Sequence, residues 1–165
     1  MFFKIFDKSK KRHFLDNIEV FGIEKINELL IKSGKERIRA YSGNLSKDEL
    51  SQLIRILPVE SIGLYVSKEI HNKKTNKHET RLSLDGINFW KEQISGRIVQ
   101  LNKEQEARWF RGEDIEVEED QIRDIKEKGF VLLKSSYYGD LIGTGKLSND
   151  NVIFNFMPKE RRRRN

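Results

Sequence analysis

The stretch GTGK at residues 143–146 contains the residue types that hold phosphates in nucleotide-binding loops. Those loops use glycine backbone N–H groups and a lysine in the pattern G-x-x-x-x-G-K-[ST]. Here Asp140 stands where the first glycine should be, and Leu147 replaces the hydroxyl residue. The dinucleotide pattern G-x-G-x-x-G also fails, because its last position is Ser148. The spacing therefore favours glycines that let a strand bend or lie close to another backbone.

Residues that could carry catalysis or bind a metal are few. His71 and His78 lie in a lysine-rich stretch with Glu79 as the nearest carboxylate, which is a weak ligand set. The acidic run EDIEVEED at 113–120 could form a metal-dependent hydrolase site, but a helix surface or solvated linker explains it more simply. The chain has no cysteine and no G-x-S-x-G. We predict no catalytic residue, no metal site and no cofactor, so that the protein is not an enzyme.

The charge balance favours an anionic partner. The net charge is +6 and the pI is about 9.4, which is typical of proteins that bind nucleic acid or another anionic surface. Residues 1–95 contain 18 Lys and Arg against 13 Asp and Glu. The end of the chain forms a second basic region, with Lys134, Lys146, Lys159 and the run RRRR at 161–164.

The composition indicates a soluble protein with a modest core, since 36% of residues are hydrophobic and 35% are charged. No apolar run approaches the roughly 20 residues of a membrane helix. The N-terminal MFFKIFDKSKKRH lacks the apolar core of a secretory signal. We expect a cytoplasmic protein without a membrane partner.

The pattern predicts two domains. Residues 1–95 should form an α/β domain with helices over 21–34 and 44–58 and strands over 36–43, 61–70 and 80–90. In the second helix, Ser46 and Glu49 form a capping box and Pro58 is the stop, whereas Gly34 should end the first helix. The polar run at 71–79 should link the last two strands.

Residues 96–165 should form the second domain. The pattern predicts a strand at 97–101, a helix within 102–115 and strands at 129–135, 140–148 and 151–156. A run of antiparallel strands indicates a small β-barrel or a strongly bent sheet, so the fold class is α+β. We expect four bulky aromatic residues to lie in the core: Trp90, Trp109, Phe154 and Phe156. Of the pair Tyr137 and Tyr138, one ring should lie in the core and the other at the surface.

Three segments of the second domain resemble the PUA-like RNA-binding module at the C-terminus of Sun/Fmu-type RNA cytosine-5 methyltransferases. They are ARWFRGEDIE at 107–116, GFVLLKSSYYGDLIGTGKL at 129–147 and NFMPKERR at 155–162. In that module an aromatic-R-G-E helix, a G-x-G-K strand and an N-x-x-P-K-x-x-R close follow one another. PUA denotes the pseudouridine synthase and archaeosine transglycosylase domain, a small RNA-binding β-barrel. The chain has no room for an S-adenosylmethionine domain and no cysteine to attack cytosine, so the resemblance implies RNA binding without the catalyst.

The junction between the domains is similar to that of the Nip-seven type of large-subunit ribosome biogenesis proteins. The similarity covers KTNKHETRLSLDGINFW at 74–90 and GRIVQLNKEQEARWFRGEDI at 96–115. Those proteins have an α/β pre-PUA domain directly before a PUA domain, at about this total length. The resemblance implies a pre-PUA-like domain at 1–95 and a PUA-like domain at 96–165.

These observations predict a non-catalytic RNA-binding protein. Its partner would be structured RNA, either ribosomal or transfer RNA, and its role would lie in ribosome biogenesis or beside an RNA-modifying enzyme. An RNA methyltransferase or ribosome assembly factors would be further partners. The predicted RNA-binding residues are Arg108, Arg111, Lys134, Tyr138, Lys146, Lys159, Arg161 and Arg162.

Four alternatives stay open. Arg111 could pair with the acidic run, and Arg163 and Arg164 could belong to a solvated tail. The protein could instead be a protein-interaction module whose RNA affinity is incidental. A small metal-dependent hydrolase that uses the carboxylates of 113–120 ranks last.

Overall fold

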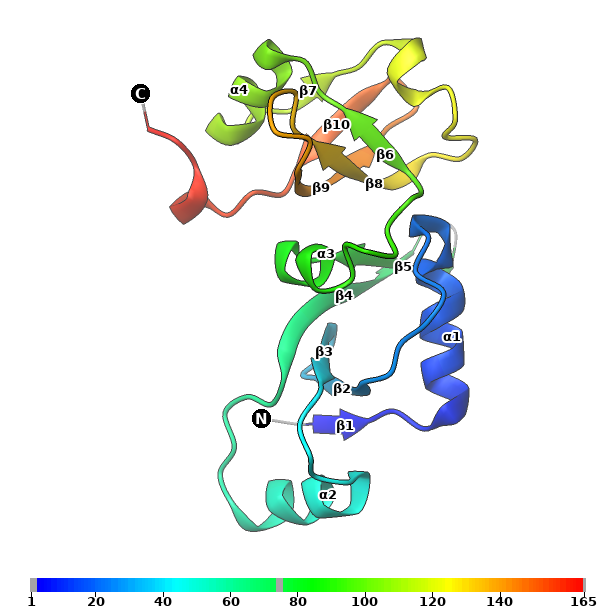
Figure 1. Cartoon of the computed structure of the whole chain (residues 1–165), viewed down its shortest axis with the longest axis vertical. Helices are drawn as coiled ribbons and strands as arrows, with labels where there is room; N and C mark the ends of the chain where they lie inside the picture. The colour runs from blue at the N-terminus through cyan, green and yellow to red at the C-terminus, as the bar shows by residue number, and fades with distance from the viewer. Residues whose placement is uncertain (1–2, 74–75, 165) are drawn as a thin grey trace. The chain divides into compact units, whose positions relative to one another are not determined.

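The computed structural model describes residues 3–73 and 76–164. The chain divides into two compact units, Met1–Ile94 and Ser95–Asn165, and each contains one five-stranded sheet (Figure 1). The fold is therefore mixed α/β. In the described part of the chain, no helix is both long enough and apolar enough to cross a membrane.

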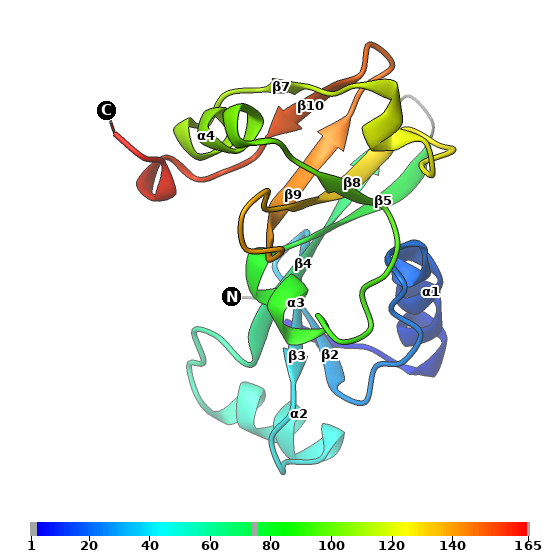
Figure 2. The same ribbon diagram turned by 45° about the horizontal axis from the view of Figure 1, so that its top comes forward.

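The N-terminal unit places a single antiparallel sheet between helices. Its elements are β1 (Phe3–Ile5), α1 (Lys8–Ile18), the 3-10 helix η1 (Glu19–Phe21), β2 (Leu29–Ser33), β3 (Arg37–Tyr41), α2 (Lys47–Ile56), β4 (Leu64–Asn72), β5 (Lys77–Leu82) and α3 (Leu84–Phe89). The sheet order is β1-β2-β3-β4-β5. Ile31 of β2 packs with Leu50 of α2, whereas the neighbouring Lys32 shares a cavity with α1. Because successive strand residues point to opposite faces, α1 and α2 lie on opposite sides of the sheet (Figure 2).

The capping signals of α2 are confirmed. The Ser46 hydroxyl accepts a hydrogen bond from the Glu49 N–H at 3.3 Å, and the Ser46 N–H donates to the Glu49 carboxylate at 2.7 Å. The helix ends at Ile56, before Pro58. These bonds satisfy backbone donors that a helix start leaves unpaired.

The predicted helix over residues 21–34 is wrong. The structure has α1 upstream of that range and strand β2 within it. Gly22 adopts a left-handed φ of 92° and ends η1, and Gly34 at φ 65° forms the turn between β2 and β3. The apolar spacing was compatible with a helix, but pairing with both β1 and β3 made Leu29–Ser33 an interior strand.

The predicted strand over 80–90 is correct only at its start. Strand β5 ends at Leu82, and Ser83 caps α3 by accepting from the Gly86 N–H at 3.0 Å. The polar run at 71–79 is not a simple linker, because β4 extends to Asn72 and β5 begins at Lys77. Residues 74–75 of that run lie outside the described residues.

The C-terminal unit is a curled sheet with a helix packed on its inner face. Its elements are β6 (Ile98–Gln100), α4 (Lys103–Arg111), β7 (Ile115–Glu116), the 3-10 helix η2 (Glu119–Ile122), β8 (Gly129–Lys134), β9 (Leu141–Leu147), β10 (Val152–Asn155) and the 3-10 helix η3 (Lys159–Arg161). The order is β6-β8-β9-β10-β7, with β6 parallel to β8 and the other pairs antiparallel. Among the described residues of this unit the strands form a half-barrel with β6 and β7 at its edges, so the expected bent sheet is present and the barrel is open.

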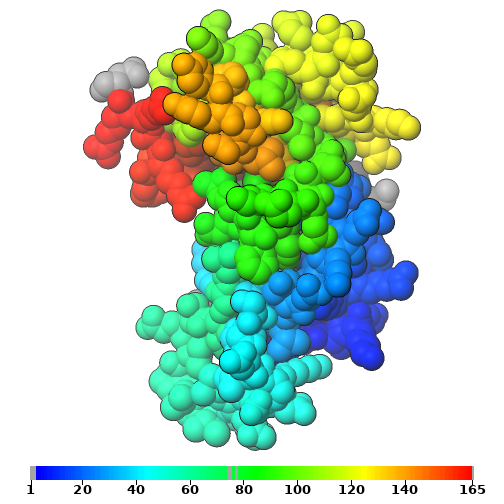
Figure 3. All heavy atoms as spheres, in the orientation of Figure 1, coloured from blue at the N-terminus to red at the C-terminus, as the bar shows by residue number. Residues whose placement is uncertain are grey.

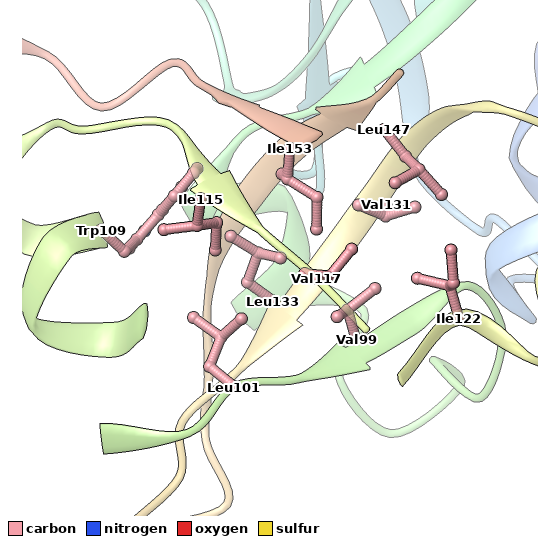
Figure 4. Close-up of a cluster of buried hydrophobic side chains, with 10 residues drawn as sticks. All are labelled: Val99, Leu101, Trp109, Ile115, Val117, Ile122, Val131, Leu133, Leu147 and Ile153. Atoms are coloured by element: carbon pink, nitrogen blue, oxygen red, sulfur yellow. The ribbon is translucent and has the colours of Figure 1, made fainter. Parts of the chain in front are cut away.

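The core of this unit explains the glycines of GTGK. Trp109 of α4 is 1% exposed and lies at one end of a cluster with Ile115, Ile153 and Leu147 (Figure 4). A Cβ on Gly143 would lie 3.1 Å from the Trp109 ring, and one on Gly145 would collide with the Ile153 side chain. The glycines therefore make room for core side chains, and Trp109 is a core residue as expected. Trp90 is also buried, at 4% exposed.

Candidate nucleic-acid interface

Two adjacent tyrosines stand out from the C-terminal unit. Tyr137 is 69% exposed and Tyr138 is 77% exposed, in the loop of residues 135–140 that joins β8 to β9. Their rings form an edge-to-face pair with centroids 5.0 Å apart. The expectation that one ring would enter the core is wrong, because both residues lie in the loop beyond the end of β8 and both are largely exposed. We call residues 135–140 the tyrosine loop; it lies on the surface in orange in Figure 3.

The tyrosine loop is fixed to α4 by one carboxylate. Oε2 of Glu106 accepts hydrogen bonds from the Ser136 N–H at 2.8 Å, the Ser136 hydroxyl at 2.8 Å and the Ser135 hydroxyl at 3.0 Å. Burial raises the pKa of Glu106, but the bonds from Ser136 and Ser135 outweigh it and hold the pKa below its ordinary value. The carboxylate is thus ionised and anchors the loop.

A second set of bonds shapes the loop backbone. The Ser135 hydroxyl oxygen accepts from the N–H groups of Tyr137 at 3.2 Å and Tyr138 at 3.4 Å. The Gln100 side chain donates to the Ser135 carbonyl at 2.6 Å, and the Ser135 N–H donates to the Asp140 carbonyl at 2.7 Å. The two exposed rings therefore extend from a loop whose backbone is held by several hydrogen bonds.

Cations accompany the tyrosines. The Lys103 ammonium lies 5.6 Å from the Tyr137 ring centroid, within the range of a cation–π contact. The half-buried Lys134 side chain passes next to Gly139, with its Cε 3.6 Å from where a Cβ of that glycine would be. The loop therefore combines stacking surfaces with positive charge.

The two predicted arginines of α4 share one acidic partner. Arg108 donates from Nε to Glu113 at 3.0 Å, and Arg111 donates from Nε to the other carboxylate oxygen at 2.5 Å. The bonds from Arg111 and Arg108 lower the pKa of Glu113, and the same carboxylate raises the pKa of Arg111. The structure therefore shows the alternative in which Arg111 pairs with the acidic run. Arg108 pairs with the same residue, Glu113.

The C-terminal segment, residues 155–164, is docked on the end of α4. The Asn155 side chain donates to the carbonyls of Trp109 at 2.8 Å and Glu113 at 3.0 Å. Arg162 donates to the Met157 carbonyl at 3.1 Å and packs against Gly112, the left-handed residue that ends α4. Asn155 therefore satisfies carbonyls at the end of the helix. The motif N-x-x-P-K-x-x-R at residues 155–162 thus holds the C-terminal segment against α4, and we call these contacts the clasp.

The clasp continues to Arg163. Its N–H donates to the Phe110 carbonyl at 2.7 Å, and its guanidinium lies 4.7 Å from the Phe110 ring centroid. Arg163 is thus part of the folded unit, whereas the alternative placed it in a solvated tail. Lys159 and Arg161 of η3 are exposed. The C-terminal segment appears in red in Figure 3, on the same face as the tyrosine loop.

Lys146 lies on the other side of the sheet. Gly143 and Gly145 face Trp109 and α4, so the alternating Lys146 points to the opposite face. Its ammonium lies 5.2 Å from the Phe130 ring centroid. Strands β8, β9 and β10 adjoin as expected, and Lys146 lies opposite Phe154 of β10, on the face turned away from α4.

The sheet face of Lys146 carries exposed rings. Phe154 is 44% exposed and Phe156 is 39% exposed, so their expected burial in the core is wrong. Phe154 is directly opposite Lys146 in the register of β9 and β10, whereas its neighbour Ile153 takes the core side. The alternation of β10 thus places Phe154 outward.

Seven of the eight predicted residues therefore lie around α4, in two groups. Lys134 and Tyr138 belong to the end near Lys103, and the arginines and Lys159 to the end near Gly112. The predicted set of RNA-binding residues did not include Tyr137, Lys103 and Arg163. The pair of tyrosines between polar residues in SSYYGD was the available signal for the first of these.

The acidic run does not form one site. Glu113 pairs with arginines, the Asp114 carboxylate accepts from the Asn155 N–H at 2.8 Å, and Asp120 pairs with Arg123 at 3.4 Å. In the described ranges, no group of three or more His, Asp or Glu side chains is arranged to hold a metal ion. His71 and His78 face each other across β4 and β5 with ring centroids 5.0 Å apart.

A known family model matches the C-terminal unit. Residues 97–163 match the family model of the methyltransferase RsmF PUA domain. The match lies within the C-terminal unit and confirms its resemblance to the PUA module of Sun/Fmu-type methyltransferases. A search of curated proteins finds no match to this chain.

Proposed function

We propose that this protein binds structured RNA, either ribosomal or transfer RNA, through the PUA domain at its C-terminus. The interface consists of the tyrosine loop, the exposed side of α4 and the C-terminal segment. The observation that carries the proposal is the exposed, preorganised pair Tyr137 and Tyr138, held by Glu106. The PUA family match supports RNA as the ligand.

The physical basis is stacking combined with phosphate contact. Unpaired bases stack on exposed aromatic rings, and lysine and arginine side chains contact the backbone phosphates. Lys103, Lys159 and Arg161 are exposed and suit the second task. Because hydrogen bonds already fix the tyrosine loop, little conformational entropy is lost on binding.

The proposed role is non-catalytic. The protein would act in ribosome biogenesis or assist an RNA-modifying enzyme such as a methyltransferase, for which it would supply RNA affinity. The N-terminal unit would correspond to a pre-PUA domain. Its mixed helix-and-sheet architecture directly before the PUA domain supports this assignment.

The deciding experiment measures RNA affinity of the full chain by fluorescence anisotropy. The double variant Tyr137→Ala/Tyr138→Ala should lose about 1–3 kcal/mol of binding free energy for each base that stacks on a ring. The matched variant Tyr137→Phe/Tyr138→Phe keeps both rings and should bind as the wild type does. Equal affinity of the alanine and phenylalanine variants would refute the proposed interface.

Charge-reversal variants test whether RNA binds on the side of α4 and the C-terminal segment or on the sheet face of Lys146. Lys159→Glu/Arg161→Glu should weaken RNA binding strongly, whereas Lys146→Glu should have a smaller effect because it faces away from α4. For about five phosphate contacts, log K should fall with log salt at a slope of roughly −3.5 to −4.5. A binding constant that does not change with salt would contradict phosphate contact.

A protein-interaction module is the second candidate, and one observation favours it. Ile56 is 73% exposed and Leu57 is 51% exposed at the end of α2, which leaves an apolar surface on the N-terminal unit. The variant Lys159→Glu/Arg161→Glu distinguishes RNA binding from protein binding. Loss of RNA binding with a partner complex intact supports RNA as the ligand, and the opposite result supports a protein partner.

A further inference from the structure

The N-terminal unit contains a cavity lined mainly by the basic residue types lysine and histidine. Its volume is about 270 Å³. The side chains around it come from α1, β1, β2, β4, β5 and the β1–α1 connection: Lys4, Phe6, Lys10, His13, Lys32, Glu69 and His78. We call it the cation pocket. It lies in a different unit from the RNA interface proposed above.

The strand register places two lysines of the pocket side by side. Lys4 of β1 is directly opposite Lys32 of β2 in the antiparallel pair. Like charges at such positions destabilise a sheet. Lys10 of α1 adds a third ammonium group to the same cavity. Three elements therefore bring lysines to one cavity against the preference of the sheet for opposite charges, and such departures from local preference are expected at functional sites.

Nearby carboxylates pair with two of the three lysines and leave Lys4 without a carboxylate partner. Glu69 pairs with Lys32 at 2.5 Å. Asp7 pairs with Lys10 at 3.3 Å, and it also caps α1 by accepting from the Lys10 N–H at 2.8 Å. Over residues 3–73 and 76–164, no carboxylate forms an ion pair with Lys4.

The protonation behaviour agrees with this geometry. The hydrogen bond with Lys10 and the Lys10 charge lower the pKa of Lys4, and burial and Lys32 lower it further, against the opposing effect of Asp7. The same bond with Lys4 raises the pKa of Lys10. The two amines therefore act directly on each other, and Asp7 offsets only part of the effect on the pKa of Lys4. The unit as a whole has an excess of cations, since residues 1–95 contain 18 Lys and Arg against 13 Asp and Glu.

We propose that the cation pocket binds a phosphate group. Three ammonium groups from separate elements can each donate to a different phosphate oxygen, and the His13 and His78 rings can add further donors. A monovalent carboxylate would use fewer of these donors and neutralise less of the charge. The phosphate can come from the RNA backbone or from a free phosphate compound, because both present the same oxygens.

Inorganic phosphate is the first probe. Its affinity for the full chain would be measured by amide chemical-shift titration of Phe6, Lys10 and Lys32 at constant ionic strength. We expect Lys4→Gln/Lys10→Gln to lose at least about tenfold in phosphate affinity, as for the loss of a charge-assisted hydrogen bond. The control Lys8→Gln/Lys35→Gln makes the same charge change outside the pocket and should bind as the wild type does.

Folding of the variant is checked independently. Removing Lys4 and Lys10 relieves repulsion, so the Tm of Lys4→Gln/Lys10→Gln without phosphate should be no lower than that of the control. Lys32→Gln is a second variant, since it leaves Glu69 facing the phosphate, and it should also weaken binding. Absence of phosphate shifts in the wild type, or equal phosphate affinity of pocket and control variants, would overturn the proposal.

An RNA titration then identifies the source of the phosphate. If Lys4→Gln/Lys10→Gln weakens both phosphate and RNA binding, the RNA backbone supplies the group. If only phosphate affinity falls, a free phosphate compound does. Tyr137→Ala/Tyr138→Ala should leave phosphate affinity unchanged, so this inference and the proposed RNA interface can fail separately.

Discussion

Oε2 of Glu106 accepts two hydrogen bonds from Ser136, one from its N–H and one from its hydroxyl, each 2.8 Å long. The two residues are thirty positions apart, and their contact joins α4 to the tyrosine loop. The orientation of two exposed tyrosines therefore depends on one carboxylate in a helix. This relationship makes Glu106 a positioning residue for the proposed interface, although it is an acid in a site for a polyanion.

Loss of this carboxylate should loosen the tyrosine loop. Glu106→Ala should reduce the free energy of unfolding by about 1–3 kcal/mol, because buried donors of Ser135 and Ser136 lose their acceptor. RNA affinity should fall even though a negative charge has been removed. Glu104→Ala is the control on the same helix, and it should not weaken RNA binding. A gain in RNA affinity in Glu106→Ala would show that its charge matters more than its bonds.

The same contact predicts a pH dependence. Because the folded-state pKa of Glu106 is lowered, its contribution to stability is fully present above the ordinary glutamate pKa of 4.5 and is lost as the pH falls through the folded-state value. Carboxyl carbon shifts in NMR should give a Glu106 titration midpoint below 4.5. In Ser135→Ala/Ser136→Ala the midpoint should rise, since burial then acts with fewer opposing bonds. An unchanged midpoint in that variant would contradict this assignment.

Glu113 should restrain RNA binding by holding two arginines. Glu113→Gln removes the charge that pairs with Arg108 and Arg111, so both guanidinium groups become available to phosphates. RNA affinity at low salt should rise several-fold, and the magnitude of the salt slope should grow by about 1–2. Glu119→Gln makes the same charge change in η2. Identical effects of the two variants would place the arginines outside the interface.

The glycines of GTGK should be required for packing. Gly145→Ala should cost about 1–3 kcal/mol of unfolding free energy, because its Cβ meets the Ile153 side chain and lies 3.1 Å from the Phe154 carbonyl oxygen. Gly143→Ala should cost less, since its Cβ meets only the edge of the Trp109 ring. Urea unfolding would measure both. The reverse order of stability would contradict the packing described here.

Local signals in the sequence determined several elements of the fold. The Ser46–Glu49 capping box and Pro58 marked α2, because capping depends on residues three positions apart. The alternating apolar pattern located β8, β9 and β10, and the failed loop spacing of GTGK indicated a strand. The family motifs located the PUA domain, which the match at 97–163 confirms.

Tertiary contacts decided the rest. Leu29–Ser33 is a strand because β1 and β3 pair with both of its edges, which its own apolar spacing could not show. Packing of Trp109 on Gly143 and Gly145 turned Lys146 to the opposite face of the sheet. Glu106 fixed both tyrosines at the surface, and Glu113 took both arginines. The sequence alone thus indicated which residue types could bind RNA. The orientation and the partners of these side chains depended on contacts between distant segments, and a single sequence contains no local signal for such contacts.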